Sequence, residues 1–141
     1  MANTIFKRLV IAFSISFIVS MPYSFYQYNN AIAGPDAEGI GQLIIALNFA
    51  LNIFNFLCSL PAFLNLNKYV RDFYILSFLS FCGAPLVILL GMLGIYLFGN
   101  TANKSMSDFL SIALPAVIFN AVLVYGFVKF RDNVDNEVIL S

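Results

Sequence analysis

The amino-acid sequence predicts an all-α integral membrane protein, a four-transmembrane-helix bundle with both termini on the cytoplasmic side. Three observations predict this class: 61% of the 141 residues are hydrophobic, only 10% are charged, and the charges fall in short clusters between long uncharged stretches. A soluble domain carries about 25% charged residues. A soluble chain this short could not bury so much apolar surface, because small domains leave much of their surface exposed. Lipid is the solvent that accepts such a chain.

Four uncharged stretches of 18 to 26 residues have the length of a membrane span: 9–26, 40–64, 73–98 and 109–128. A span needs roughly 20 residues at a rise of about 1.5 Å each. In lipid every backbone N–H and C=O group must be paired within the protein, so the stretches are predicted to be helices. We expect helices near residues 9–28, 40–64, 73–98 and 108–128, in a single membrane domain that covers residues 1–141.

The basic residues predict the orientation of these helices. With four spans, one set of flanking segments holds Lys7, Arg8, Lys68, Arg71, Lys129 and Arg131, whereas the other set holds only Lys104. The positive-inside rule places the larger set in the cytoplasm. We therefore expect a bacterial inner membrane protein whose two termini are both cytoplasmic.

The N-terminal segment has a second interpretation, a cleaved secretory signal. Lys7 and Arg8 precede an apolar run, and Ala31-Ile32-Ala33 resembles a small-residue cleavage site. Twelve residues separate Met21 from a cut after Ala33, and they include several bulky aromatic residues, which is unusual for a signal peptide. The uncleaved helix is the favoured interpretation, and cleavage stays open as the alternative.

The first predicted helix has a small residue at every fourth position: Ala12, Ser16, Ser20 and Ser24. Residues at this spacing share one face of a helix, and small residues allow a neighbouring backbone to approach closely. We interpret this face as packing within the chain. A homodimer interface is the alternative.

The second predicted helix carries a polar stripe. Asn48, Asn52, Asn55 and Ser59 are spaced by four, three and four residues, so they share one face. An amide that faced lipid would lose its hydrogen bonds to water, at a cost of several kcal/mol. The stripe must therefore face protein or water. It either hydrogen-bonds to polar groups on other helices, or it lines a solute path or a docking surface; the candidate bonding groups are Ser16, Ser20, Ser77, Ser80 and Asn120.

The third predicted helix places Ser77, Ser80, Ala84 and Gly91 on one face, and we expect it to be the central packing helix. The fourth is expected to begin at a capping signal, Ser107 before Asp108, and it contains one embedded amide, Asn120. Each span holds a proline, and the four are Pro22, Pro61, Pro85 and Pro115. We expect Pro85 and Pro115, which lie deepest, to bend their helices.

Groups that carry chemistry are absent from the predicted spans. None of the four uncharged stretches contains Asp, Glu, Lys, Arg or His, although proton-coupled transporters and pumps nearly always place such a group within a span. The chain has no histidine and only two cysteines, Cys58 and Cys82, so we expect no metal and no cofactor, and we expect both thiols to be reduced. No nucleophile–base pair or phosphate-binding loop is visible, so we expect no enzyme, and the zero net charge gives no indication of nucleic-acid binding.

Two families of similar size do not fit. Small multidrug transporters carry a glutamate in their first helix, and small fluoride channels carry a glycine- and arginine-containing signature there; this chain has neither. We expect a non-enzymatic protein of the lipid bilayer that binds and blocks a membrane-inserted partner, as an immunity protein blocks the inserted domain of a pore-forming bacterial toxin. The alternative is a small flippase- or carrier-like transporter with a polar path along the second helix.

These hypotheses assign two sets of residues. The residues expected to contact a partner or line a path are Asn48, Asn52, Asn55, Ser59 and Asn120. The residues expected to pack helices together are Ala12, Ser16, Ser20, Ser80, Ala84 and Gly91.

Overall fold

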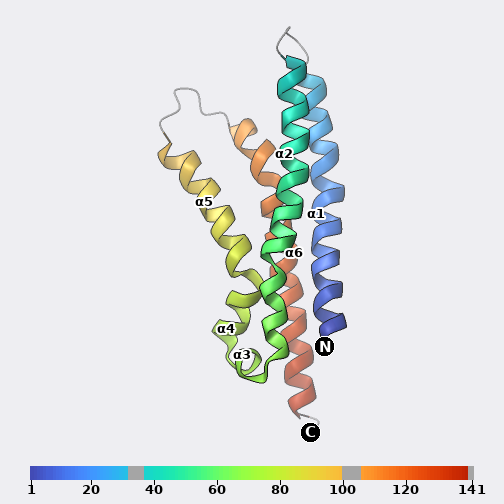
Figure 1. Cartoon of the computed structure of the whole chain (residues 1–141), viewed down its shortest axis with the longest axis vertical. Helices are drawn as coiled ribbons and strands as arrows, with labels where there is room; N and C mark the ends of the chain where they lie inside the picture. Colours follow the sequence, from blue (N-terminus) through green and yellow to red (C-terminus); the bar gives the residue numbers. More distant parts are fainter. Residues whose placement is uncertain (32–36, 100–105, 140–141) are drawn as a thin grey trace.

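The computed structural model describes residues 1–31, 37–99 and 106–139, although not the side chains of 30–31, 37–41, 106–108, 111 and 135–139. The described residues form helices and no strand. Figure 1 shows them in chain order: α1 (Ala2–Ala31), α2 (Ala37–Cys58), η1 (Leu60–Leu66), α3 (Lys68–Asp72), α4 (Tyr74–Phe78), η2 (Leu79–Gly83), α5 (Ala84–Phe98) and α6 (Met106–Ile139).

Among the described residues, four helical segments are long and apolar enough to cross a membrane, which confirms the predicted all-helical class. They are Ala2–Asn29, Gln42–Leu66, Tyr74–Phe98 and Ile112–Val134. The predicted boundaries were too short at both chain ends, because α1 has 30 residues and α6 has 34. A helix of 30 residues is about 45 Å long, so its ends extend beyond a hydrocarbon core of about 30 Å. The predicted Ser107 cap lies outside the described side chains.

Pro61 changes the second span from one kind of helix to another. The α-helix stops at Cys58, and the chain continues as a 3-10 helix over Leu60–Leu66 with Pro61 in its first turn. Proline has no N–H group to donate to the carbonyl four residues earlier, so the α-helical ladder cannot pass through this position unbroken. The predicted single helix over 40–64 is therefore two segments.

Pro85 has a similar effect on the third span. A π-helix over Leu79–Gly83 separates α4 from α5, and Pro85 is the second residue of α5. Because proline cannot donate, a wider helical turn just before it takes up the missing hydrogen bond. The predicted helix over 73–98 is thus α4, η2 and α5 in succession.

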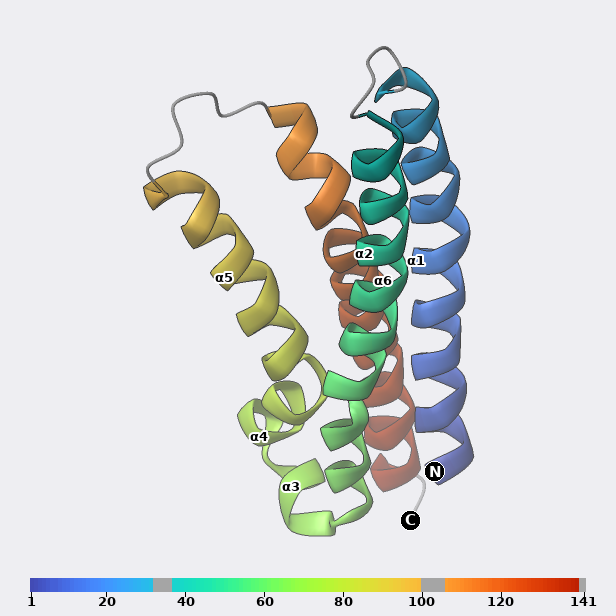
Figure 2. The same cartoon turned by 45° about the horizontal axis from the view of Figure 1, so that its top comes forward.

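The helices are not arranged as an even bundle. α1, α2 and α6 lie side by side, whereas α5 leaves them at its first residues and diverges toward its far end (Figures 1 and 2). η1, α3 and α4 form a compact turn at the end of the molecule that also holds both chain termini. The expectation that the third span is the central packing helix is therefore wrong for the single chain, because α1 and α6 occupy that place.

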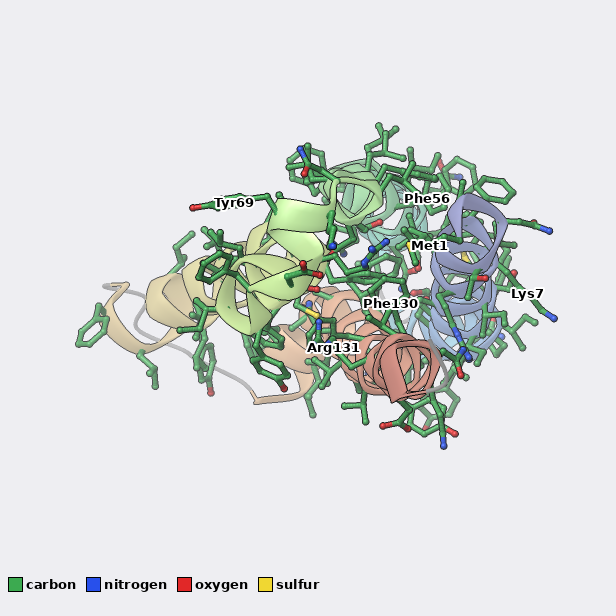
Figure 3. The ribbon with its side chains drawn as sticks, turned by 90° about the horizontal axis from the view of Figure 1, so that it is seen from below. Met1, Lys7, Phe56, Tyr69, Phe130 and Arg131 are labelled. Carbon is green, nitrogen blue, oxygen red and sulfur yellow. The ribbon has the colours of Figure 1, made fainter. Side chains whose placement is uncertain are left out.

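The apolar core lies in the half of the bundle nearest the termini. Its buried side chains come from α1, η1, η2 and α6, and Figure 3 shows Phe130 in the interior of this end. Phe81 lies against two rings of α6, with centroids 5.7 Å from Phe127 and 5.1 Å from Phe130. Aromatic pairs at such distances add about 0.5–1.5 kcal/mol each beyond the area they bury.

Candidate functional site

Five buried side chains join α1 to α2, and we call them the polar seam: Ser16, Ser20, Ser24, Asn48 and Asn52. The hydroxyl of Ser20 donates to Asn48 Oδ1 at 2.9 Å, and Asn48 Nδ2 donates to Ser24 Oγ at 2.6 Å. Asn52 Nδ2 donates to Ser20 Oγ at 3.1 Å and to Asn48 Oδ1 at 2.9 Å. Each amide is thus hydrogen-bonded both to its own helix face and to the facing helix.

The polar seam also reaches α6. The Ser16 hydroxyl has two acceptors within reach, Asn52 Oδ1 at 2.6 Å and the Pro115 carbonyl at 2.9 Å. Residues four apart lie on the same face of a helix. The serines of α1 and the asparagines Asn48 and Asn52 of α2 are spaced in this way, so the two polar faces can bond along their length. Interhelical hydrogen bonds in a membrane contribute about 0.5–2 kcal/mol each.

The seam brings together two patterns that the sequence offered separately. Ala12, Ser16, Ser20 and Ser24 are fully buried against neighbouring helices, so this face of α1 packs within the chain and is not available to a second copy. Asn48, Asn52 and Asn55 are buried as well, which confirms that the stripe does not face lipid. The polar groups of Asn48 and Asn52 are hydrogen-bonded to protein groups.

Asn55 continues the stripe but not its hydrogen bonds. Its side chain is 0% exposed, yet neither Nδ2 nor Oδ1 has a hydrogen-bond partner among the described residues. The reason is visible on α1, where the next small residue after Ser16 toward this level is Ala12, which has no hydroxyl to offer. Ser59, one turn further, donates to its own helix backbone at Phe56 O, 2.6 Å away.

Asn120 lies on α6 and joins it to the start of α5 instead of to the asparagines of α2. Its Nδ2 donates to the Pro85 carbonyl at 3.1 Å and to the Ala116 carbonyl at 2.8 Å. Its Oδ1 is buried and has no partner among the described residues. Asn120 is therefore the polar contact that holds the root of α5.

A second polar cluster, which we call the Asn65 clamp, was not predicted from the sequence. Asn65 Oδ1 accepts from the Ser77 hydroxyl at 2.5 Å, and Asn65 Nδ2 donates to the Ser80 hydroxyl and to the Ala62 carbonyl. The clamp fastens η1 to α4 and η2. A signal existed: Ser59, Ala62 and Asn65 step by three, which is the period of a 3-10 helix. The predicted span ended at residue 64 and followed the α-helical period, so it excluded Asn65.

Ala84 and Gly91 need a correction. Both were expected to pack against other helices, but both are exposed, and a Cβ atom added to Gly91 would meet nothing within 4 Å. They belong to a row of exposed residues that we call the outer face of α5: Ala84, Val87, Gly91, Ile95 and Phe98. Ser80, expected on the same packing face, does pack, through the Asn65 clamp. The predicted packing face is therefore half-buried at Ser80 and exposed at Ala84 and Gly91, because α5 leaves the bundle just after the π-helix.

Charged side chains gather at the end of the bundle that holds the termini. Arg131 Nη1 donates to the Arg71 carbonyl at 2.5 Å, and its guanidinium carbon lies 5.6 Å from the centroid of the Tyr74 ring. Arg8 packs its apolar stem over Gly126, whose missing Cβ would lie 3.6 Å from that of Arg8. Lys7 points away from the bundle, and Arg131 lies between α6 and the α3–α4 turn (Figure 3). These contacts fix α6 against α1 and the α3–α4 turn.

The described residues contain no group of three or more His, Cys, Asp or Glu side chains that could hold a metal ion. Cys58 is half-buried, Cys82 is buried, and both are free thiols. Comparison with protein-family models, with curated proteins and with solved structures finds no match for this chain. The geometry of the chain therefore carries the functional argument.

Proposed function

We propose that this chain is a non-enzymatic inner-membrane protein that binds a membrane-inserted partner protein through its lipid-facing helices and blocks it. In this proposal both termini are cytoplasmic, since the described basic residues cluster at the end of the bundle that holds the termini. The partner class that fits best is the inserted domain of a pore-forming or membrane-acting bacterial toxin, and the chain acts as the immunity protein.

The observation that carries the proposal is a difference between α2 and α5: the polar face of α2 is bonded to α1, whereas the outer face of α5 is exposed. The amides of Asn48 and Asn52 are engaged by serines of α1, so the seam offers no free groups to a solute. The outer face of α5, in contrast, packs against nothing in the described chain, and Val87 and Ile95 on it are 68% and 77% exposed. Helices associate in lipid by close packing at small residues, and Ala84 and Gly91 supply them here.

The coupling chemistry of a carrier is also lacking. Every described Asp, Glu, Lys or Arg side chain lies at the end of the bundle near the termini, and none at mid-depth. Coupled transporters nearly always place an ionisable group within their spans. Blocking a partner by contact requires no such group.

The proposal is tested by protection. Cells expressing the chain are challenged with a set of membrane-inserting bacterial toxins while their membrane potential is recorded. We expect the wild-type chain to preserve the potential against at least one toxin, and Gly91→Phe to lose this protection because the ring blocks close helix approach. Val19→Phe, at an exposed position of α1, is the matched control and should still protect.

A carrier function is the second candidate, favoured by the unpartnered amide of Asn55 and by the divergence of α5. It predicts that the purified protein, alone in liposomes, moves a solute or lipid across the bilayer with saturable kinetics. That result, together with absence of protection in cells, would overturn the blocking proposal.

A further inference from the structure

The side-chain amide of Asn55 and the Oδ1 atom of Asn120, which have no partners among the described residues, lie at nearly the same depth in the bundle, close to where α5 departs. The Ser16 hydroxyl touches both Asn52 and Pro115, so these two residues share a level. α2 and α6 run in the same direction from there (Figure 1). Asn55 follows Asn52 by about 4.5 Å along the axis and Asn120 follows Pro115 by about 7.5 Å, so the two differ in depth by only about 3 Å.

Asn120 lies where α5 and α6 meet, and α2, the helix that carries Asn55, contacts both of them. Asn120 donates to the carbonyl of Pro85 at the root of α5. Asn55 is fully buried and Asn120 is 4% exposed, so neither reaches lipid. Three polar atoms remain without partners among the described residues: Asn55 Nδ2, Asn55 Oδ1 and Asn120 Oδ1.

From these observations we infer that Asn55 and Asn120 form a binding site for a small neutral guest that both donates and accepts hydrogen bonds, namely one ordered water molecule. Its oxygen accepts from Asn55 Nδ2, and its two hydrogens are donated to Asn55 Oδ1 and Asn120 Oδ1. A buried water typically makes about three hydrogen bonds, which is the number that these three atoms supply.

The charge distribution favours a neutral guest over a cation. Two amide oxygens and the Pro85 carbonyl are ligands that Na⁺ accepts, but the described carboxylates all lie at the end of the bundle near the termini. A cation at this depth would have no counter-charge, and the cost of an uncompensated charge inside a membrane protein is several kcal/mol. Water satisfies the same oxygens without that cost.

The site follows from a single interruption in the sequence pattern. The serine ladder of α1 gives way to Ala12 at the level below Ser16, while the asparagine stripe of α2 continues to Asn55. An asparagine without a serine partner must be satisfied from elsewhere, because an unpaired buried amide costs about 1–3 kcal/mol. The inference is independent of the partner proposed above.

The site is tested by proton-detected solid-state NMR on the full chain in lipid bilayers, with water as the probe. We expect a cross-peak between water and the side-chain NH₂ of Asn55 and none at the NH₂ of Asn52, whose donors are bonded to protein. Asn120→Leu should remove the Asn55 cross-peak while the Asn52 signals keep their positions, which shows that the fold is retained.

Three outcomes would overturn the inference. The Asn55 amide could show magnetisation transfer to a protein carbonyl and not to water. The water cross-peak could survive Asn120→Leu, so that Asn120 is not part of the site. The side-chain carbonyl signals of Asn55 and Asn120 could shift when Na⁺ replaces choline as the only cation, which would identify an ion site instead.

Discussion

At the scale of single residues, one side-chain type has different roles along one helix face, according to what the facing helix offers. Asn48 and Asn52 meet serines and become interhelical fasteners. Asn55 lies one turn below Asn52, where α1 has Ala12 in place of a serine, and its amide has no partner among the described residues. Chemical identity alone therefore does not assign a role to an asparagine in this stripe.

This difference predicts unequal effects of one substitution at neighbouring positions. Asn52→Leu removes bonds to Ser16 and Ser20, so the free energy of unfolding in mixed micelles should fall by about 1–2 kcal/mol. Asn55→Leu should lower it less, because Asn55 has no hydrogen bond to another helix to lose among the described residues, and the cost is confined to Asn120 Oδ1, which then lacks the water proposed above. Equal losses in an SDS titration of the two variants would contradict the assignment.

At the scale of elements, two of the four prolines, Pro61 and Pro85, coincide with a change in the kind of helix, whereas Pro22 and Pro115 lie inside the continuous helices α1 and α6. From the sequence, bends were expected at Pro85 and Pro115; the helix type changes just before Pro85, and it also changes at Pro61, where one helix over 40–64 was expected. The type of helix at each position was not predictable, because contacts with other helices determine whether a turn is 3-10, α or π. The structure has a 3-10 helix at Pro61 and a π-helix just before Pro85. The Asn65 clamp depends on the 3-10 helix, so a search for residues at α-helical spacing could not predict it.

The clamp predicts a local change in stability. Asn65→Ala removes the acceptor of Ser77 and the donor to Ser80, so amide hydrogen exchange should become faster in Leu60–Leu66 and Leu79–Gly83. Asn67→Ala is the matched control, because Asn67 is exposed and caps only the following short helix through Tyr69 N at 2.9 Å. Mass spectrometry of exchanged peptides from the detergent-solubilised protein would show the difference. Unchanged exchange over both segments in Asn65→Ala would argue against the clamp.

The splayed position of α5 predicts motion in this helix that α2 does not share. Spin labels at Ile95 on α5 and Ile18 on α1, in a chain with both cysteines replaced by alanine, should give a broad distance distribution by double electron–electron resonance. The pair Leu43 and Ile18, on α2 and α1, should give a narrow one because the polar seam fixes these helices. Distributions of equal width would show that α5 is as firmly held as α2.

At the scale of the whole molecule, the chain is a three-helix bundle with a fourth span attached at its root. The number of spans, the helical class and the buried asparagine stripe were all predictable, because lipid leaves few alternatives for long uncharged stretches. The departure of α5 was not predictable, because Ala84 and Gly91 look alike whether they face protein or lipid. Small residues indicate that another helix can approach closely, but the sequence does not show whether a helix of this chain does so.

The clustering of basic residues at one end predicts the topology of the whole molecule. Alkaline phosphatase fused after Ser141 should be inactive, and the same enzyme fused after Lys104 should be active, because it folds only outside the cytoplasm. Immunoblots for equal expression complete the comparison. Activity of the Ser141 fusion would reverse the orientation proposed here.

The central claim is that a membrane-inserted partner docks on the outer face of α5. Site-specific photo-cross-linking tests it most directly. Benzoylphenylalanine is placed at Val87 on that face and, as the control, at Ile18, an exposed residue of α1. In cells that the chain protects from a toxin, illumination should give an adduct of the chain and that toxin at Val87 and not at Ile18. Protection that persists with no toxin adduct at Val87, or with equal adducts at both positions, would contradict the claim.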